Sequence, residues 1–177
     1  MPQFAGSAHF MCNHPSCLPE VELLQQCSLR HDRRSGPGGQ HRNKVETAVV
    51  IEHNNTGIVA EASERRSQVD NRRVAIQRLR LALAIGYRCS SSPPTPTSLW
   101  CSRTARGRLS IAKEHEDLPC LLAELLDRLQ QLDYSFPACA EFFDVSSSQL
   151  MKLLRQSPHA LTQVNAERVE RGMHKLT

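Results

Sequence analysis

The apolar positions of this 177-residue chain follow two patterns, a strand pattern in the first half and a helical pattern in the second. β-Branched or alternating apolar residues occur in three short runs, at 26–33, 44–53 and 58–62. The Asn-Asn-Thr-Gly sequence at 54–57 predicts a tight turn between the second and third runs, because Asn and Gly tolerate positive φ. The pattern therefore predicts a strand, a longer connection and a β-hairpin.

A single long helix is predicted directly after the hairpin. Ser67 followed by Asp70 is a capping-box signature for its start. Helical spacing predicts that one face is buried, formed by Val69, Ile76, Leu79 and Leu83. Three to four strands with a packed helix make a small α+β domain.

The last third of the chain is rich in Leu, Ala, Gln and Glu, which indicates helices. Leucines at helical spacing predict a core helix at 118–132. The apolar skeleton of 138–156 matches a helix-turn-helix, with Asp144 at the turn position where such motifs often have glycine. Ser146 and Gln149 form a capping box for its second helix.

These patterns divide the chain into four segments. Residues 1–24 are expected to form an N-terminal tail with a short helix at 20–26, and residues 25–88 the α+β domain. Residues 89–109 are expected to form a linker, first rich in Ser and Pro and then basic. Residues 110–177 are expected to form an all-α C-terminal domain.

Composition excludes several classes of protein. Hydrophobic residues make up 40% and charged residues 23% of the chain, as in globular proteins, which argues against wholesale disorder. The longest apolar run, 81–85, is far shorter than the roughly 20 residues that span a bilayer. No Lys or Arg precedes Arg30, so neither a secretory signal nor a transit peptide is expected. We therefore expect a cytoplasmic protein with no membrane contact. The net charge of +4 permits a polyanionic partner without identifying one.

The seven cysteines are odd in number and scattered along the chain, and no two of them form a CxxC pair. This pattern favours reduced thiols over a disulfide framework. Four metal-capable residues lie close together near the N-terminus, namely His9, Cys12, His14 and Cys17. Zinc sites usually combine ligand pairs from separate elements, so we expect no metal site here. No cofactor is expected either.

The segment 33–44, between the first two predicted strands, is the most informative stretch for function. Its sequence is RRSGPGGQHRNK, with three glycines in four residues. Glycine lets a backbone approach another surface closely, and the flanking cations suit phosphates. The residues alone leave two interpretations open, a flexible basic hairpin loop and a phosphate-contacting loop.

Catalysis by an ionisable side chain of this segment is disfavoured. His41 lies among cations, which disfavour its imidazolium form. Ser35 has no evident His–Asp partners that would make it a nucleophile. The amide of Gln40 has no useful pKa and cannot be a general base, but it can orient a water molecule.

Five short motifs occur in the order seen in class I peptide chain release factors, namely SGPGGQHRNK at 35–44, TAV at 47–49, TGI at 56–58, RSQ at 66–68 and NR at 71–72. The stretch 25–85 thus resembles the peptidyl-tRNA hydrolase domain of that family. The resemblance implies an enzyme whose GGQ loop enters the peptidyl transferase centre of the large ribosomal subunit. There it promotes the attack of water on the ester between nascent peptide and tRNA.

The resemblance also implies site residues. The catalytic tip would be Gly38, Gly39 and Gln40, and Gln40 would be a candidate for N5-methylation. The residues expected to contact rRNA or tRNA are Arg33, Arg34, Ser35, His41, Arg42, Asn43, Lys44, Arg66, Ser67, Gln68, Asn71 and Arg72.

The resemblance implies a set of partners as well: large-subunit rRNA, P-site peptidyl-tRNA and a glutamine methyltransferase. No DNA partner is expected, and the chain is expected to be a monomer.

A codon-reading domain is not expected. Only about 24 residues precede the hydrolase domain, too few to fold as a domain. This arrangement resembles the branch of the family that rescues stalled ribosomes without reading a codon. Two alternatives stay open: an RNA-binding or ribosome-binding module that has lost hydrolysis, and a helix-turn-helix DNA regulator, which would leave the GGQ segment unexplained.

The C-terminal helices do not identify a partner. Residues 138–177 contain five basic and four acidic side chains, unlike the strongly basic disordered tail of some rescue factors. A helical packing unit is therefore favoured over an RNA contact for the second helix of the predicted pair. The preceding basic stretch, with Arg103, Arg106, Arg108 and Lys113, is the better candidate for RNA contact, and a solvated charged strand is the alternative there.

Overall fold

The structure is a computed structural model that describes residues 14–32, 47–90 and 92–176. These residues form two compact units. We call the described residues of 14–88 and 116–123 the sheet unit, and the described residues of 89–115 and 124–176 the helical unit. Each is described by itself below.

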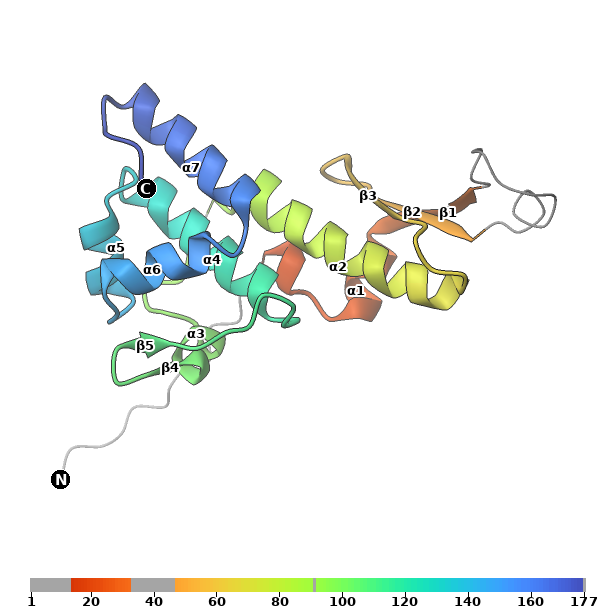
Figure 1. The fold of residues 1–177 in the computed structure, drawn as a ribbon, viewed down its shortest axis with the longest axis horizontal. Helices are drawn as coiled ribbons and strands as arrows, with labels where there is room; N and C mark the ends of the chain where they lie inside the picture. Colours follow the sequence, from red (N-terminus) through yellow and green to blue (C-terminus); the bar gives the residue numbers. More distant parts are fainter. Residues whose placement is uncertain (1–13, 33–46, 91, 177) are drawn as a thin grey trace. The chain divides into compact units, whose positions relative to one another are not determined.

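The sheet unit is a three-stranded antiparallel sheet with a long helix on one face (Figure 1). The strand order is β1-β2-β3, and Ile51 in the central strand pairs with Leu29 on one side and Ala60 on the other. In chain order the unit contains α1 (Glu20–Gln25), β1 (Cys27–Asp32), β2 (Ala48–His53), β3 (Ile58–Ala62) and α2 (Gln68–Gly86), with the start of α4 (Leu118–Gln131).

The core of the sheet unit lies between the sheet and α2. Alternation along β2 directs Val49 and Ile51 toward the helix, where Leu79 and Leu83 are fully buried. The β2–β3 turn has Gly57 at φ +67°, a conformation that residues with a Cβ rarely adopt. The turn predicted at 54–57 is thus present where the sequence placed it.

The N-terminal part of the sheet unit differs from the tail expected for residues 1–24. His14, Ser16 and Leu23 are buried, and Leu23 belongs to the same hydrophobic core as Ile51 and Leu79. The guanidinium of Arg80 on α2 donates a hydrogen bond of 2.7 Å to the Ser16 carbonyl. Polar contacts of this kind attach the segment to α2, and apolar periodicity does not reveal them.

The first turn of α2 also differs from the expected apolar face. Ser67 is the N-cap, and its hydroxyl accepts a hydrogen bond from the backbone N–H of Asp70, as the sequence predicts. Val69, however, is 71% exposed, and the buried side chain of this turn is Asn71. Asn71, Ala75 and Leu79 are spaced four residues apart, so they share the inward face of the helix.

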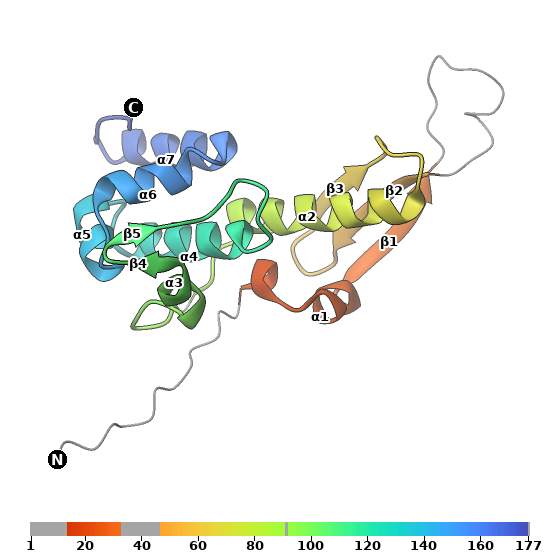
Figure 2. The same cartoon turned by 60° about the horizontal axis from the view of Figure 1, so that its bottom comes forward.

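The helical unit contains four further helices and a small hairpin, in addition to the rest of α4 (Figure 2). Leu125, Leu126 and Leu129 of α4 are completely or almost completely buried, as their spacing predicts. In chain order the other elements are α3 (Ser98–Arg103), β4 (Thr104–Ala105), β5 (Arg108–Leu109), α5 (Phe136–Phe142), α6 (Ser147–Leu154) and α7 (Pro158–Glu170).

Residues 98–109 fold into α3 and the β4–β5 hairpin, in the region where the sequence suggested a linker. Trp100 of α3 is 1% exposed and stacks on Phe143, with ring centroids 3.8 Å apart. The buried Glu124 carboxylate accepts hydrogen bonds from the Thr97 backbone N–H (2.8 Å) and hydroxyl (2.6 Å), which holds the start of α3. Both contacts are long-range in sequence, so local composition does not predict them.

The predicted helix pair is present as α5 and α6. Asp144 lies between the two helices at φ +50°, the left-handed conformation that its position suggested. Ser146 is the N-cap of α6, and its hydroxyl accepts a hydrogen bond from the Gln149 backbone N–H. The chain is therefore a mixed fold, a three-stranded sheet with a packed helix followed by several helices, as predicted.

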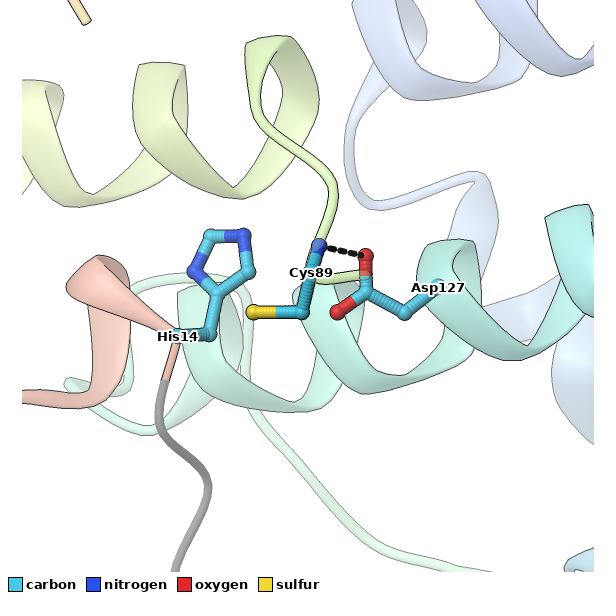
Figure 3. Close-up of side chains that lie close together, drawn as sticks. All are labelled: His14, Cys89 and Asp127. Atoms are coloured by element: carbon cyan, nitrogen blue, oxygen red, sulfur yellow. Dashed lines mark hydrogen bonds between the residues drawn. The ribbon is translucent and has the colours of Figure 1, made fainter. Parts of the chain in front are cut away.

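A hydrogen bond between two separate segments also supports the helical unit. The carboxylate of Asp127 on α4 is buried and accepts a hydrogen bond of 3.2 Å from the Cys89 backbone N–H (Figure 3). The described cysteines form no disulfide with one another. No helix in the described part of the chain has both the length and the apolar character needed to cross a bilayer.

Candidate nucleic-acid interface

Five of the residues that the sequence analysis assigned to RNA contact lie within the described part of the chain, all at or near the start of α2: Arg66, Ser67, Gln68, Asn71 and Arg72. The expected catalytic residues Gly38, Gly39 and Gln40 lie outside the described residues. So do the other expected RNA contacts, namely Arg33, Arg34, Ser35, His41, Arg42, Asn43 and Lys44.

The start of α2 lies beside the point where the chain returns to the sheet after the GGQ segment. Asp32, the last residue of β1, pairs with Ala48, the first residue of β2. The Asn71 side-chain amide donates a hydrogen bond of 2.7 Å to the carbonyl of Thr47, the residue before Ala48. The first turn of α2 is therefore at the same end of the sheet as the termini of β1 and β2 (Figure 2).

Asn71 is a structural residue within this arrangement. It is fully buried, and its amide group also donates to the Arg65 carbonyl (2.9 Å) while its side-chain oxygen accepts from the Arg65 N–H (2.9 Å). Both donors and the acceptor of the side chain are thus engaged with the backbone. Asn71 joins β2, the segment before α2 and α2 itself.

Four arginines surround this turn: Arg65, Arg66, Arg72 and Arg73. All four are exposed, and none of their guanidinium groups has a partner among the residues that the structure describes. We call this set the α2 arginine cluster. The signal for Arg65 and Arg73, which the sequence analysis missed, was present in the paired arginines on either side of the SQVDN sequence.

The other described arginines of the sheet unit have partners. Arg78 forms an ion pair with Glu64 at 2.7 Å, and this guanidinium lowers the pKa of the Glu64 carboxyl. Arg80 bonds to the Ser16 carbonyl, and Arg88 donates to the carbonyls of Ala84 and Ile85. Arg30 also has an interaction partner. In the described part of this unit, the guanidinium groups without an interaction partner are therefore those of the α2 arginine cluster.

The electrostatics of this turn favour an anion. The N-terminus of a helix has a partial positive charge from its unpaired backbone N–H groups, and α2 is a 19-residue helix. The neighbouring Glu64 is already paired with Arg78, so Asp70 is the acid that remains in the turn. Exposed arginines around a helix start are suited to phosphate groups.

The metal-capable residues near the N-terminus are not all described. His9 and Cys12 lie outside the described residues. His14 is buried, and its Nδ1 accepts hydrogen bonds from the Ser16 backbone N–H (3.1 Å) and hydroxyl (2.7 Å). Its Nε2–H donates to the Tyr87 carbonyl at 3.2 Å. Both ring nitrogens thus have protein partners.

Comparison with known proteins identifies the class to which this arrangement belongs. Residues 24–100 match the RF-1 domain, which covers the whole sheet, α2 and the GGQ segment. This part of the chain is therefore an RF-1 domain, and it is similar to the corresponding part of class I peptide chain release factors.

Individual relatives support the same family. The mouse protein "Mitochondrial translation release factor in rescue" is 34% identical over 122 residues, which cover 68% of this chain and 64% of that protein. Peptide chain release factor 1 of Ureaplasma parvum is 40% identical over 84 residues, 44% of this chain and 23% of that protein. The Geobacter sulfurreducens factor of the same name is 40% identical over 87 residues, 46% of this chain and 24% of that protein. The chain thus spans less than two thirds of the length of these relatives.

Proposed function

We propose that this protein hydrolyses the ester bond of peptidyl-tRNA on the ribosome and so releases the nascent peptide. The observation behind the proposal is the GGQ sequence at 38–40 within a matched RF-1 domain. We take residues 25–88 as the hydrolase domain, and the large-subunit rRNA and the P-site peptidyl-tRNA as its partners. The cytoplasm is the expected compartment.

In the proposed reaction, a water molecule attacks the ester carbonyl carbon, and the tRNA ribose oxygen leaves with a proton. Gln40 orients the water through its amide, which has no useful pKa and so cannot act as a general base. A backbone N–H beside it stabilises the developing oxyanion, a contribution of about 100- to 1000-fold in rate. Gly38 and Gly39 allow the backbone to lie against RNA without a Cβ.

The binding role falls to cations on both sides of the GGQ sequence. The α2 arginine cluster is exposed, lacks partners among the described residues and lies near the end of β1 and the start of β2. It would bind rRNA phosphates and orient the domain. The further RNA contacts we propose are Arg33, Arg34, Ser35, His41, Arg42, Asn43 and Lys44, with Ser67 and Gln68 at the helix start.

We further propose that the release is independent of the codon and serves ribosome rescue. The mouse relative is a release factor in rescue by its name, and it covers more of this chain than the peptide chain release factor 1 relatives do. Methylation of Gln40 by a glutamine methyltransferase would tune the activity.

The test is peptide release from purified stalled ribosomes with radiolabelled nascent peptide. Replacing Gly39 with Val adds a branched side chain at the proposed tip and should lower the rate of release at least 100-fold, while ribosome binding stays within about twofold. Release by the unchanged chain should be equally fast with sense, stop or no codon in the A site. Gly57→Asn, in the β2–β3 turn with open space around it, is a control for general effects of glycine replacement, because Asn tolerates the positive φ of this position.

Two outcomes would contradict the proposal. Unchanged release by Gly39→Val would exclude the catalytic assignment, and tight binding without any release would favour a non-catalytic RNA-binding module. A strong preference for stop codons would contradict the rescue role alone.

A further inference from the structure

The helical unit contains seven arginines, and five of them have interaction partners. The Arg128 guanidinium lies 3.7 Å from the centre of the Phe142 ring, and Arg168 donates to the Tyr134 carbonyl at 2.6 Å. Arg171 pairs with Glu167 at 2.6 Å, and both Arg103 and Arg155 also have partners. The exceptions are Arg106 and Arg108, whose guanidinium groups have none among the described residues.

Both exceptions lie at the turn of the β4–β5 hairpin. Ala105 pairs with Arg108, so Arg106 and Gly107 form a two-residue loop. Both loop residues have positive φ, +51° and +70°, as in a type I′ turn. Asn, Asp and Gly are preferred there, and an arginine in this conformation costs about 1 kcal/mol. The turn therefore presents an exposed arginine at a position where the backbone disfavours one.

The hairpin is held firmly on the helical unit. Leu109 on β5 is buried, and β5 packs against α6. Trp100, immediately before the hairpin, stacks on Phe143 between α5 and α6. Further along, the Gln156 side chain donates to the Ile111 carbonyl at 3.2 Å. The two arginines thus project from a supported turn, which reduces the entropy lost when they bind a ligand.

The stretch of sequence that contains the hairpin is basic and polar. Residues 98–115 contain four basic side chains, Arg103, Arg106, Arg108 and Lys113, against the single acid Glu114, a local excess of +3 in a chain of net charge +4. The exposed large hydrophobic residues of the described chain are Val21, Val59, Val69 and Val169, none of them in this stretch. A protein interface usually has an apolar centre, whereas a nucleic-acid backbone is bound mainly by cations.

We propose that the β4–β5 hairpin is a second RNA-binding surface, separate in the sequence from the α2 arginine cluster, on which Arg106 and Arg108 bind phosphates of the RNA backbone. Guanidinium groups form two parallel hydrogen bonds to one phosphate, so two of them fix a register on the backbone without reading bases. The surface adds affinity for RNA that is independent of the proposed hydrolysis. It also gives the helical unit a role in RNA binding.

The test measures binding of the full chain to a radiolabelled RNA stem-loop by filter binding, over a series of salt concentrations. The variant Arg106→Asn/Arg108→Gln removes both cations and places at the turn a residue that tolerates positive φ. We expect about tenfold weaker binding near 0.1 M salt and a salt slope lower by about 1.5, the value for two lost phosphate contacts. Far-UV circular dichroism checks that the variant is folded.

A matched control removes two charges elsewhere. Lys152 and Lys175 are exposed residues of the same unit without partners among the described residues. The variant Lys152→Gln/Lys175→Gln should keep the original salt slope. An equal loss of RNA affinity in both variants would show that only the net charge matters. An unchanged RNA affinity in the hairpin variant would exclude the hairpin as a binding surface. Either result overturns the proposal. The stem-loop assay contains neither ribosomes nor peptidyl-tRNA, so its result is independent of peptide release.

Discussion

Asn71 connects parts of the backbone that are 24 residues apart in the chain. Its side chain bonds to the Thr47 carbonyl and to both backbone groups of Arg65, and it is fully buried. A buried polar side chain is tolerated when its hydrogen bonds are satisfied, and its removal leaves the former partners unsatisfied. The residue therefore holds the α2 arginine cluster at the end of the sheet.

Replacing Asn71 with Ala should lower the free energy of unfolding by about 3 kcal/mol, because three backbone groups lose their partner. Urea unfolding followed by circular dichroism measures this effect. Asn55→Ala, at an exposed position in the β2–β3 turn, should change stability by less than about 0.5 kcal/mol. If Asn71→Ala were as stable as the original chain, the structural role of this side chain would be wrong.

His14 makes the stability of the sheet unit dependent on pH. Burial lowers the pKa of its imidazole to about 4, from an ordinary value near 6.5. Below pH 6.5 the unfolded chain therefore binds a proton that the folded chain does not. Its contribution to stability is complete above pH 6.5 and declines as the pH falls toward 4. Burial also lowers the pKa of His53, which acts in the same direction.

The unfolding free energy of the unchanged chain should therefore decrease on acidification from pH 7 to pH 4.5, with about 2–3 kcal/mol of the decrease due to His14. In His14→Gln, the decrease should be smaller by that amount. Urea titrations at the two pH values give the comparison. Asn55→Ala replaces an exposed side chain that does not titrate and should leave the pH dependence unchanged. An unaltered pH dependence in His14→Gln would rule out His14 as its source.

At the scale of elements, the local signals in the sequence were sufficient for most of the fold. The caps at Ser67 and Ser146, the turn glycine at 57 and the left-handed residue at 144 all depend on one to four neighbouring residues. Alternation and helical spacing then determine which faces of β2 and α4 are buried. Local chemistry was thus enough to predict the three-stranded sheet, α2 and the α5–α6 pair.

The elements that differ from prediction depend on long-range contacts. The burial of Trp100 requires Phe143, and the start of α3 requires Glu124, 27 residues from Thr97. The segment around Ser16 is attached by Arg80, 64 residues away. The exposure of Val69 has the same origin, since Asn71 occupies the inward position of that turn to reach Thr47. No local pattern includes these partners.

The turn between α5 and α6 allows a test at this scale. Asp144 is exposed and has φ +50°, a conformation that glycine adopts without a steric penalty. Asp144→Gly should leave the free energy of unfolding unchanged or raise it by up to about 1 kcal/mol, whereas Asp144→Val should lower it by more than about 1 kcal/mol. Thermal unfolding of the two variants measures the difference. Equal stability of the glycine and valine variants would contradict the backbone assignment.

At the scale of the whole molecule, the uncommitted guanidinium groups of the described chain occur in two places, the α2 arginine cluster and the β4–β5 hairpin. The amino-acid sequence alone indicates part of each, because clusters of arginine are visible without a structure. It could not separate these arginines from Arg78, Arg80 or Arg128, which are engaged in internal contacts. That distinction requires the folded partners.

If both places bind phosphates, their contributions to RNA binding should add. Replacing Arg72 and Arg73 with Gln should lower the salt slope for the stem-loop by about 1.5, and combining these changes with Arg106→Asn/Arg108→Gln should lower it by about 3. Filter binding of the four proteins measures this sum. Replacing the internally paired Arg171 with Gln is a control that should leave the slope unchanged. If the combined variant lowered the salt slope no more than either pair of substitutions alone, the two places would not bind RNA independently.

Trp100 makes the two units distinguishable by spectroscopy. It is the single tryptophan of the chain, it belongs to the helical unit, and it is buried against Phe143. Its emission should therefore be blue-shifted in the folded state and should report on the helical unit alone. The far-UV signal, in contrast, includes α2 of the sheet unit. Comparing the two signals during one denaturation shows whether the units unfold together or in sequence.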